Sequence, residues 1–257
     1  MSMRTRNLIM LLAVMFVGQF CAAQAIMVVA AADLQFAMQD VAAKFQKETG
    51  KDVKLTYGSS GSFFEQLQNG APFDMFFSAN LDYPKELRTA GLVEPGSYYE
   101  YAKGRIVIWV RKDSKLDLSS GLQVLLNPSI KKIAVANPRH APYGQAAVAA
   151  MQKASVYDKV KDKFVFGENI SQTASFVMSG AADVGIVALS LALSPNTKDI
   201  GRYVEIPADE YPPIEQACVI LRSSQNKETA MQFLSFIKTA AVADTLRRYG
   251  FDVPSTE

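Results

Sequence analysis

The chain has 257 residues, of which 49% are hydrophobic and 20% are charged, with 15 glycines and 11 prolines. This composition is typical of a folded globular protein and excludes a disordered chain, a collagen-like repeat and a disulfide-rich miniprotein. The 27 basic and 25 acidic residues leave a net charge of +2, too small for a protein that binds nucleic acid through its charge. A single histidine and two cysteines exclude zinc-finger arrays and most histidine-rich metal sites.

The first 25 residues have the three parts of a signal peptide. Arg4 and Arg6 form a basic start, residues 8–17 form an apolar core, and residues 23–25 (AQA) fit the small-x-small pattern of signal peptidase sites. A membrane anchor is disfavoured, because an apolar core of about ten residues falls short of the ~20 that a spanning helix needs. We therefore expect an exported, periplasmic protein that is cleaved after about Ala25.

Cleavage at this place changes the charge and the cysteine count. It removes Arg4 and Arg6 but no acidic residue, so 25 basic residues face 25 acidic ones in the mature chain. It also removes Cys21 and leaves Cys218 alone, which excludes an internal disulfide. Because Cys218 lies in the apolar run 217–221, we expect it to be a buried small hydrophobic residue rather than a reactive thiol.

Strand-like and helix-like segments alternate in the first part of the mature chain. Short apolar or alternating runs predict strands at residues 26–31, 53–57 and 73–78. Helical spacing predicts helices from Leu34 to Gly50, over residues 62–69 and over residues 83–90. Asp33 stands directly before the first of these helices and is a natural N-cap. Repeated β-α-β units of this size predict a parallel sheet with helices on both faces.

A second set of elements follows. Strands are predicted at residues 105–110, 132–136, 184–187 and 216–221, and helices at 144–153, 170–178 and twice within 227–249. Residues 98–104 and 207–213 are rich in turn-forming residues, and we expect the chain to cross between two lobes there. The predicted fold is α/β with two lobes, each a mainly parallel sheet flanked by helices. Lobe I comprises residues 26–104 and 211–257, and lobe II comprises residues 105–210.

Catalytic motifs are sparse. His140 is the only histidine, so any Ser-His or Cys-His mechanism has to use it, and it lies in the turn 137–142 (NPRHAP). The sequence offers no nucleophile as its partner and contains no GxSxG, Walker A, HExxH or CxxC pattern. A secreted two-lobed enzyme is therefore the weaker alternative, and a binding protein that is not an enzyme is favoured.

Three corners between a strand and a helix consist of small and hydroxyl residues. They are residues 30–33 (AAAD), 57–62 (YGSSGS) and 78–80 (SAN). Backbone N–H groups at the start of a helix bind an anion without help from lysine or arginine, and Ser60 or Ser62 adds a hydroxyl donor. Ordinary helix capping explains any one of these corners. Three in one lobe favour a ligand cleft at the carboxyl ends of the strands.

These corners belong to a set of segments that resembles the periplasmic molybdate-binding proteins of ABC importers. The resemblance extends over about residues 27–253. It is carried by the segments 30–34 (AAADL), 59–62 (SSGS), 70–79 (GAPFDMFFSA), 134–138 (AVANP), 141–144 (APYG), 167–170 (GENI), 182–187 (ADVGIV) and 248–251 (RYGF). It implies a type II periplasmic-binding-protein fold that closes on one tetrahedral oxyanion, molybdate or tungstate. It also implies a monomer without a cofactor that delivers the anion to an inner-membrane permease and its ATPase.

The resemblance implies oxyanion contacts at particular positions. Carried over residue by residue, they are the hydroxyl of Ser60 and the backbone N–H groups of Ala79, Tyr143 and Ile170. Two further positions depart from the family's pattern. Asp33 stands where the first corner commonly offers a serine hydroxyl, and Ala188 stands where well-known members have a tyrosine that contacts the anion.

Neutral donors in a dry cleft hold a dianion, and the size of the cleft separates molybdate and tungstate from the smaller sulfate. Protonated phosphate needs an acceptor that a site of donors alone does not offer. A carboxylate at Asp33 repels an oxyanion, so we expect this side chain to cap the helix that follows while its backbone N–H serves the ligand. The alternative is that Asp33 binds a protonated ligand, a cation or the metal centre. For this reason another small anion or an organic acid stays open as the ligand.

Overall fold

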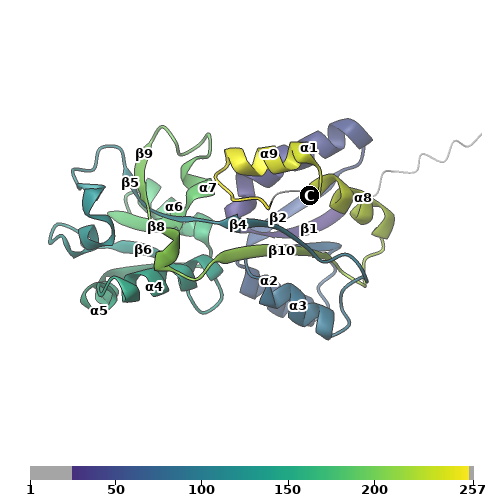
Figure 1. The fold of residues 1–257 in the computed structure, drawn as a ribbon, viewed down its shortest axis with the longest axis horizontal. Coiled ribbons are helices and arrows are strands. Elements are labelled where there is room, and N and C mark those ends of the chain that lie inside the picture. Colours follow the sequence, from purple (N-terminus) through teal and green to yellow (C-terminus); the bar gives the residue numbers. More distant parts are fainter. Residues whose placement is uncertain (1–24, 255–257) are drawn as a thin grey trace, which may run out of the picture.

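Two five-stranded sheets lie side by side in the computed structural model, which describes residues 25–254 (Figure 1). The first sheet has the order β2 (Val53–Gly58), β1 (Ile26–Ala31), β3 (Met75–Ser78), β10 (Ile214–Ile220) and β4 (Tyr99–Gly104). The second has the order β7 (Phe164–Gly167), β6 (Ile133–Ala136), β8 (Val184–Ala188), β5 (Ile106–Arg111) and β9 (Gly201–Glu205). The predicted signal peptide, apart from Ala25, lies outside the described residues.

Each sheet combines parallel and antiparallel pairs. Strands β2, β1 and β3 are mutually parallel, as are β7, β6 and β8 in the second sheet. The strands that carry the chain between the sheets add the antiparallel pairs β3–β10, β10–β4, β8–β5 and β5–β9. The sheets are therefore parallel in their first three strands and mixed as a whole.

The chain crosses from one sheet to the other at two places. It leaves the first sheet at the end of β4 and enters the second at β5, with the single residue Arg105 between them. It returns between β9 and β10 through a short 3-10 turn, η4 (Ala208–Glu210). The two crossing segments, from β4 to β5 and from β9 to β10, run close together between the lobes in Figure 1. The final helices consequently pack on the lobe that contains β1.

Helices cover both faces of the first sheet (Figure 1). Three of them, α1 (Gln35–Thr49), α8 (Lys227–Ile237) and α9 (Ala240–Arg248), lie on one face, where Phe45, Phe77 and Phe233 form an aromatic core. The helices α2 (Ser60–Gln68) and α3 (Asp82–Thr89) lie on the other face. Alternate residues of β1 face the two cores, Val28 the first and Val29 the second. This alternation is what a strand covered on both faces requires.

The second sheet is covered by α4 (Pro142–Lys153) and α6 (Ile170–Met178), each of which packs against three or more of its strands. Shorter helices complete this lobe: α5 (Tyr157–Val160), α7 (Leu189–Ala192), η2 (Leu118–Leu126) and η3 (Lys161–Lys163). Its core also includes Ala31, Ala32 and Ala79 of the first sheet's corners. The two lobes are thus in apolar contact where β1 and β3 end.

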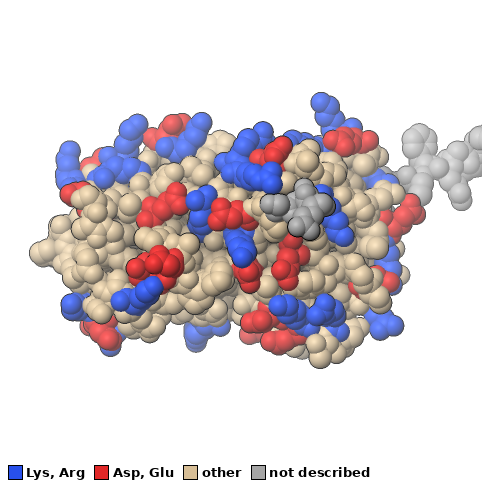
Figure 2. Space-filling model, in the orientation of Figure 1, with Lys and Arg blue, Asp and Glu red and all other residues tan. Residues whose placement is uncertain are grey.

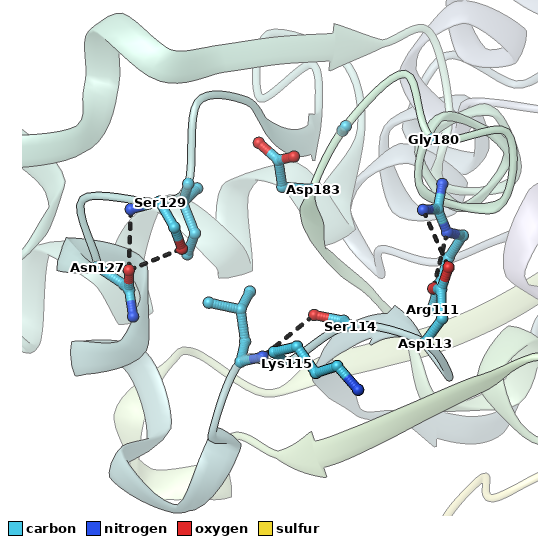
Figure 3. Close-up of a pocket in the computed structure, with 11 residues that line it drawn as sticks. Arg111, Asp113, Ser114, Lys115, Asn127, Ser129, Gly180 and Asp183 are labelled. Carbon is cyan, nitrogen blue, oxygen red and sulfur yellow. Dashed lines mark hydrogen bonds and ion pairs between the residues drawn. The ribbon is translucent and has the colours of Figure 1, made fainter.

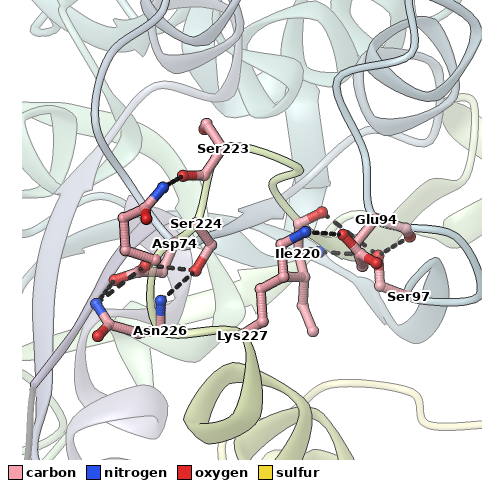
Figure 4. Close-up of polar contacts among 9 residues, drawn as sticks. Asp74, Glu94, Ser97, Ile220, Ser223, Ser224, Asn226 and Lys227 are labelled. Carbon is pink, nitrogen blue, oxygen red and sulfur yellow. Dashed lines mark hydrogen bonds and ion pairs between the residues drawn. The ribbon is translucent and has the colours of Figure 1, made fainter.

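A buried carboxylate ties three segments of the first lobe together (Figure 4). Asp74 is 5% exposed and accepts hydrogen bonds from the backbone N–H of Met27 at 2.7 Å and from Ser224 Oγ at 2.5 Å. Nearby, Lys227 Nζ lies 2.6 Å from a carboxylate oxygen of Glu94, which joins the start of α8 to the loop after α3. Asp74 therefore has a structural role far from the other lobe.

Positive and negative side chains are interspersed on the face seen in Figure 2. This distribution fits the near-neutral charge of the mature chain and gives this face no single-sign patch for a polyanion. None of the helices in residues 25–254 has both the length and the apolar character needed to cross a membrane.

Candidate functional site

The candidate ligand residues lie where β1, β3 and β8 end and where helices of both lobes begin. All six are buried, with relative exposures of 1% for Asp33, 1% for Ser60, 2% for Ala79, 3% for Tyr143, 3% for Ile170 and 0% for Ala188. They come from six separate segments of the chain and meet at the junction between the lobes. The structure therefore brings together residues that are far apart in the sequence.

Three of these residues belong to the first turn of a helix. Ser60 is the first residue of α2, Ile170 is the first residue of α6, and Tyr143 is the second residue of α4. N–H groups in a first turn have no partner inside their own helix, and they lie at the positive end of its dipole. Since Pro142 has no N–H, Tyr143 carries the first backbone donor of α4. Two of these helices, α2 and α4, begin two residues earlier than the sequence pattern predicts.

Ser60 and Ala79 contact each other. The backbone N–H of Ala79 donates to Ser60 Oγ at 2.9 Å, and both groups are buried. A hydroxyl that accepts one hydrogen bond still has its own proton to donate. The arrangement therefore aligns the Ser60 hydroxyl as a donor, with the Ala79 N–H polarising it.

Asp33 lies at the centre of a buried hydrogen-bond network. Its Oδ2 accepts from Gln216 Nε2 at 2.7 Å and from the Tyr143 hydroxyl at 2.8 Å. The Tyr101 hydroxyl donates to Gln216 Oε1 at 2.7 Å, so the amide nitrogen of Gln216 is turned toward Asp33. Among residues 25–254, no other side chain donates to the other carboxyl oxygen, Oδ1, which is also buried.

Burial raises the pKa of Asp33 to about 6. The hydrogen bonds from Gln216 and Tyr143, and the backbone N–H groups of Asp33 and Leu34 close to the carboxyl group, limit this rise because they favour the charged form. Burial also raises the pKa of Tyr143 and of Tyr101 well above the usual value, and the charge of Asp33 adds to both shifts. Both tyrosines are therefore neutral hydroxyl groups near Asp33. The carboxyl group itself changes charge close to neutral pH.

The expectation that Asp33 caps the following helix is wrong. Asp33 lies inside a 3-10 turn, η1 (Ala32–Leu34), and α1 begins after it with Leu34 as N-cap residue and without a side-chain cap. The carboxyl group turns instead to the donors of Gln216 and Tyr143, which are 183 and 110 residues away in the sequence. A local pattern could not reveal these partners.

Further hydrogen bonds connect the corner around Asp33 with the second lobe. Ser190 Oγ, in α7, donates to the backbone oxygen of Asp33 at 2.7 Å. Ser171 Oγ, in α6, donates to the backbone oxygen of Ala32 at 2.9 Å. On the α2 side, the backbone N–H of Gly61 donates to the backbone oxygen of His140 at 2.9 Å. These contacts show that the structure has its lobes closed against each other.

His140 contacts the first lobe at the edge of this junction. Its Nδ1 lies 3.0 Å from Ser59 Oγ, and its Nε2 lies 3.5 Å from a carboxylate oxygen of Glu168. The Glu168 side chain is 74% exposed, so this contact lies at the surface. His140 thus braces two loops, as the sequence favours over a catalytic role.

Ala188 ends β8, where it pairs with Ile106 and precedes the first residue of α7. It is fully buried and its methyl group carries no polar atom. Any side-chain contribution of Ala188 to a ligand is therefore packing alone. Sequence reasoning did not select Gln216, Tyr101, Ser171 or Ser190. For Gln216 a usable signal exists, because it is the one polar residue of the otherwise apolar predicted strand 216–221.

Two cavities lie outside this network. One, of about 300 Å³, opens between the lobes beside Ala79 and Pro142 and is also lined by Asp82, Lys85 and Glu215. The other, of about 290 Å³, lies in the second lobe among Arg111, Asp113, Lys115 and Asp183 (Figure 3). The first adjoins the candidate site, whereas the second contains none of the candidate residues.

The chain matches known proteins along almost its whole described length. The profile of the bacterial extracellular solute-binding proteins matches residues 26–252. The molybdate-binding protein ModA of Azotobacter vinelandii is 36% identical over 233 residues, which cover 90% of this chain and 92% of that protein. The molybdate-binding protein ModA of Rhodobacter capsulatus is 35% identical over 230 residues, covering 90% of this chain and 89% of that one.

Solved structures agree with this result. The periplasmic molybdate-binding protein of Azotobacter vinelandii superposes with a TM-score of 0.85 at 34% identity, covering 90% of this chain and all of that one. The sulfate-binding protein SubI of Mycobacterium tuberculosis superposes with a TM-score of 0.72 at 17% identity, covering 89% of this chain and 86% of that one, which shows a shared fold alone. The predicted two-lobed α/β fold and the family resemblance are confirmed. The chain belongs to the family of bacterial extracellular solute-binding proteins that includes these molybdate-binding proteins.

Proposed function

We propose that this protein captures molybdate, and also tungstate, between its two lobes and delivers it to the permease and ATPase of an ABC importer. The observation that carries the proposal is the convergence of first-turn N–H groups from α2, α4 and α6 with the Ser60 hydroxyl in one buried junction. The relatives with 35–36% identity are molybdate-binding proteins, which supports the same ligand.

We infer that the anion contacts Ser60, Tyr143 and Ile170, with Asp33 and Ala188 completing the wall of the site. Ala79, expected to donate its N–H to the anion directly, donates it to Ser60 Oγ and so acts through that hydroxyl. Donors that are fixed in a buried junction stabilise an anion more strongly than donors in water, because the local dielectric constant is low. A closed cleft of fixed size prefers anions of matching radius, which distinguishes molybdate and tungstate from sulfate.

In this proposal two lobes open and close around the two crossing segments. Lobe I comprises residues 26–104 and 211–257, and lobe II comprises residues 105–210. Hinge motions use a few residues at the ends of helices or strands. Arg105, the single residue between β4 and β5, has such a position. The open form admits the anion and the closed form holds it. We further propose that the protein is a periplasmic monomer that begins at about Ile26 after cleavage.

Calorimetric titration of the mature protein with molybdate, tungstate, sulfate, phosphate and chromate tests this function. We expect tight binding of molybdate and tungstate at one site per chain. Sulfate and phosphate should bind more weakly by a factor of 100 or more, which corresponds to about 3 kcal/mol of binding free energy. If phosphate or an organic acid binds more tightly than molybdate, the ligand is a different small anion and the proposal is wrong.

A further inference from the structure

We propose that Asp33 binds the captured oxyanion as a neutral carboxylic acid, with the proton on Oδ1 donated to an oxygen of the anion. Each dianion then enters the closed site together with one proton. This inference rests on the proposed function and concerns the same site. It assigns a role to a buried carboxyl group at the junction where we expect the anion to bind.

The network around Asp33 determines which oxygen carries the proton. Oδ2 already accepts two hydrogen bonds, from Gln216 Nε2 and from the Tyr143 hydroxyl. Neither donor can turn away without loss, because Tyr101 holds the amide of Gln216 and Gln216 Nε2 also donates to Tyr143 Oη at 3.0 Å. A proton on Oδ2 would displace one of these donors. Protonation of the carboxyl group therefore occurs on Oδ1.

The other carboxyl oxygen of Asp33, Oδ1, lacks a side-chain hydrogen-bond partner within residues 25–254. It is buried, in a residue that is only 1% exposed. The further donors near the carboxyl group are the backbone N–H groups of Asp33 itself and of Leu34. A buried carboxylate oxygen without a partner is costly. A molybdate ion presents only acceptor oxygens, so it can pair with Oδ1 only when Oδ1 carries a hydrogen. The protonated acid is then a donor like a serine hydroxyl at the same corner.

The surroundings favour the neutral acid over an ionised group that binds a cation. The titratable groups that face Asp33 are Tyr101 on β4 and Tyr143 on α4, both uncharged. The neighbours from β10, α6 and α7 are the neutral side chains of Gln216, Ser171 and Ser190. No cluster of three or more His, Cys, Asp or Glu side chains able to hold a metal ion occurs in the described chain. The adjacent helix N-termini repel cations and attract anions.

The uptake of a proton makes the affinity for the anion depend on pH in one direction. In the ligand-free closed form the pKa of Asp33 is about 6, raised by burial. A dianion beside Asp33 favours the uncharged form and raises this pKa further. Below about pH 6 the proton is already present, and affinity is level. Above it, a proton must be taken from solution, and affinity falls by up to tenfold per pH unit.

Calorimetry of the mature protein with sodium molybdate, at pH 5 and pH 8 and in two buffers of different ionisation enthalpy, measures this proton. We expect uptake of nearly one proton per molybdate at pH 8 and a smaller uptake at pH 5, where part of the ligand-free protein already carries the proton. Asp33→Asn keeps an oxygen for Gln216 and Tyr143 and offers an amide N–H to the anion. It should bind molybdate with equal affinity at both pH values, without proton uptake, and more tightly than wild type at pH 8.

Asp162→Asn is the matched control, because Asp162 is an exposed aspartate in η3, outside the junction. This variant should keep the proton uptake and the pH profile of wild type. Molybdate binding by wild type without proton uptake at pH 8 overturns the inference and leaves the proposed function standing. So does a folded Asp33→Asn variant that binds molybdate more weakly than wild type at both pH values. Absence of molybdate binding by wild type at both pH values overturns the proposed function and this inference with it.

Discussion

The hydroxyl of Tyr143 reaches across the junction between the lobes and donates to Asp33 Oδ2 at 2.8 Å. Tyr143 is the second residue of helix α4 of one lobe, and Asp33 follows strand β1 of the other. Because the two residues belong to different lobes, this hydrogen bond exists only when the lobes are closed. The position of helix α4 therefore affects both the orientation and the protonation of the Asp33 carboxyl group.

The close fit around Tyr143 leads to a prediction for Gly104, the last residue of β4. A methyl group on Gly104 would overlap Tyr143 Oη and lie 2.9 Å from Gln216 Nε2. We expect Gly104→Ala to destabilise the closed form by about 1–3 kcal/mol, the usual cost of overpacking, and to weaken molybdate binding accordingly. Calorimetric titration checks this, with Gly104→Ala/Tyr143→Phe as the companion variant, since removal of the hydroxyl relieves part of the overlap. Wild-type affinity in Gly104→Ala would contradict the closed arrangement.

The pKa of Asp33 predicts a pH dependence of stability in the absence of ligand. Burial raises this pKa from 3.8 to about 6, so the folded protein holds the proton more tightly than the unfolded chain. The stability contributed by protonated Asp33 is fully present below pH 4 and is lost as pH rises to about 6. The difference amounts to at most about 3 kcal/mol, less if the lobes open and expose the carboxylate. Urea unfolding should show Asp33→Asn gaining stability over wild type between pH 4 and pH 7, and a constant difference would contradict the shift.

The sequence pattern predicts the inner strands of both sheets better than their edges. It selects β1, β3, β6, β8, β5 and β10, which are short and largely apolar because both faces are covered. Among the edge strands it finds β2, where polar and apolar residues alternate, and misses β4, β7 and β9, which carry exposed residues such as Glu100, Phe166 and Tyr203. An edge strand pairs on one side and is solvated on the other, so its composition resembles that of a loop. For β4, the sequence indicates only a turn-rich crossing.

The candidate site also has a part that the sequence predicts and a part that it does not. Ser60, Ala79, Tyr143 and Ile170 are predicted from local corners and family resemblance, and all of them are buried near the junction between the lobes. The partners of Asp33 depend on the packing of one lobe against the other, and no local signal encodes such a contact. The orientation of Asp33 follows from Gln216, on a strand that returns from the other lobe near the end of the chain.

Ser60 is expected to matter for binding more than for stability. Its hydroxyl accepts from the Ala79 N–H and has its proton free for the anion, whereas the N-cap position of α2 belongs to Ser59. Ser60→Ala should weaken molybdate binding by roughly 1.5–3 kcal/mol, the range for a hydrogen bond to a charged group, and lower the free energy of unfolding by about 1 kcal/mol. Ser62→Ala, in the same helix and only half-buried, is the control for both measurements. An unchanged affinity with lowered stability would assign Ser60 a purely structural role.

His140 is predicted to slow the release of ligand. Its imidazole contacts Ser59 across the junction, and this contact is absent when the lobes separate. His140→Ala keeps the backbone oxygen that Gly61 uses, so it should cost the closed form only about 0.5–1.5 kcal/mol and act on the dissociation rate. Stopped-flow release of molybdate measures this rate. Glu168→Gln is the control, since its exposed pair with His140 is worth about 0–1 kcal/mol, and an unchanged release rate in His140→Ala would show that the imidazole does not hold the lobes closed.

Gly61 allows closure to be separated from folding. It lies in the first turn of α2, and a methyl group there would be 2.7 Å from the backbone oxygen and 2.9 Å from the Cα of His140 in the other lobe. Alanine suits a helix better than glycine by up to ~1 kcal/mol, so Gly61→Ala should leave the free energy of unfolding unchanged or raise it. The backbone of His140 cannot rotate away as a side chain does, so the closed form should lose about 1–3 kcal/mol and molybdate binding should weaken. Small-angle X-ray scattering with saturating molybdate should then show a larger radius of gyration than wild type. Full closure and wild-type affinity in this variant would mean that the contact between Gly61 and His140 is not part of the ligand-bound state.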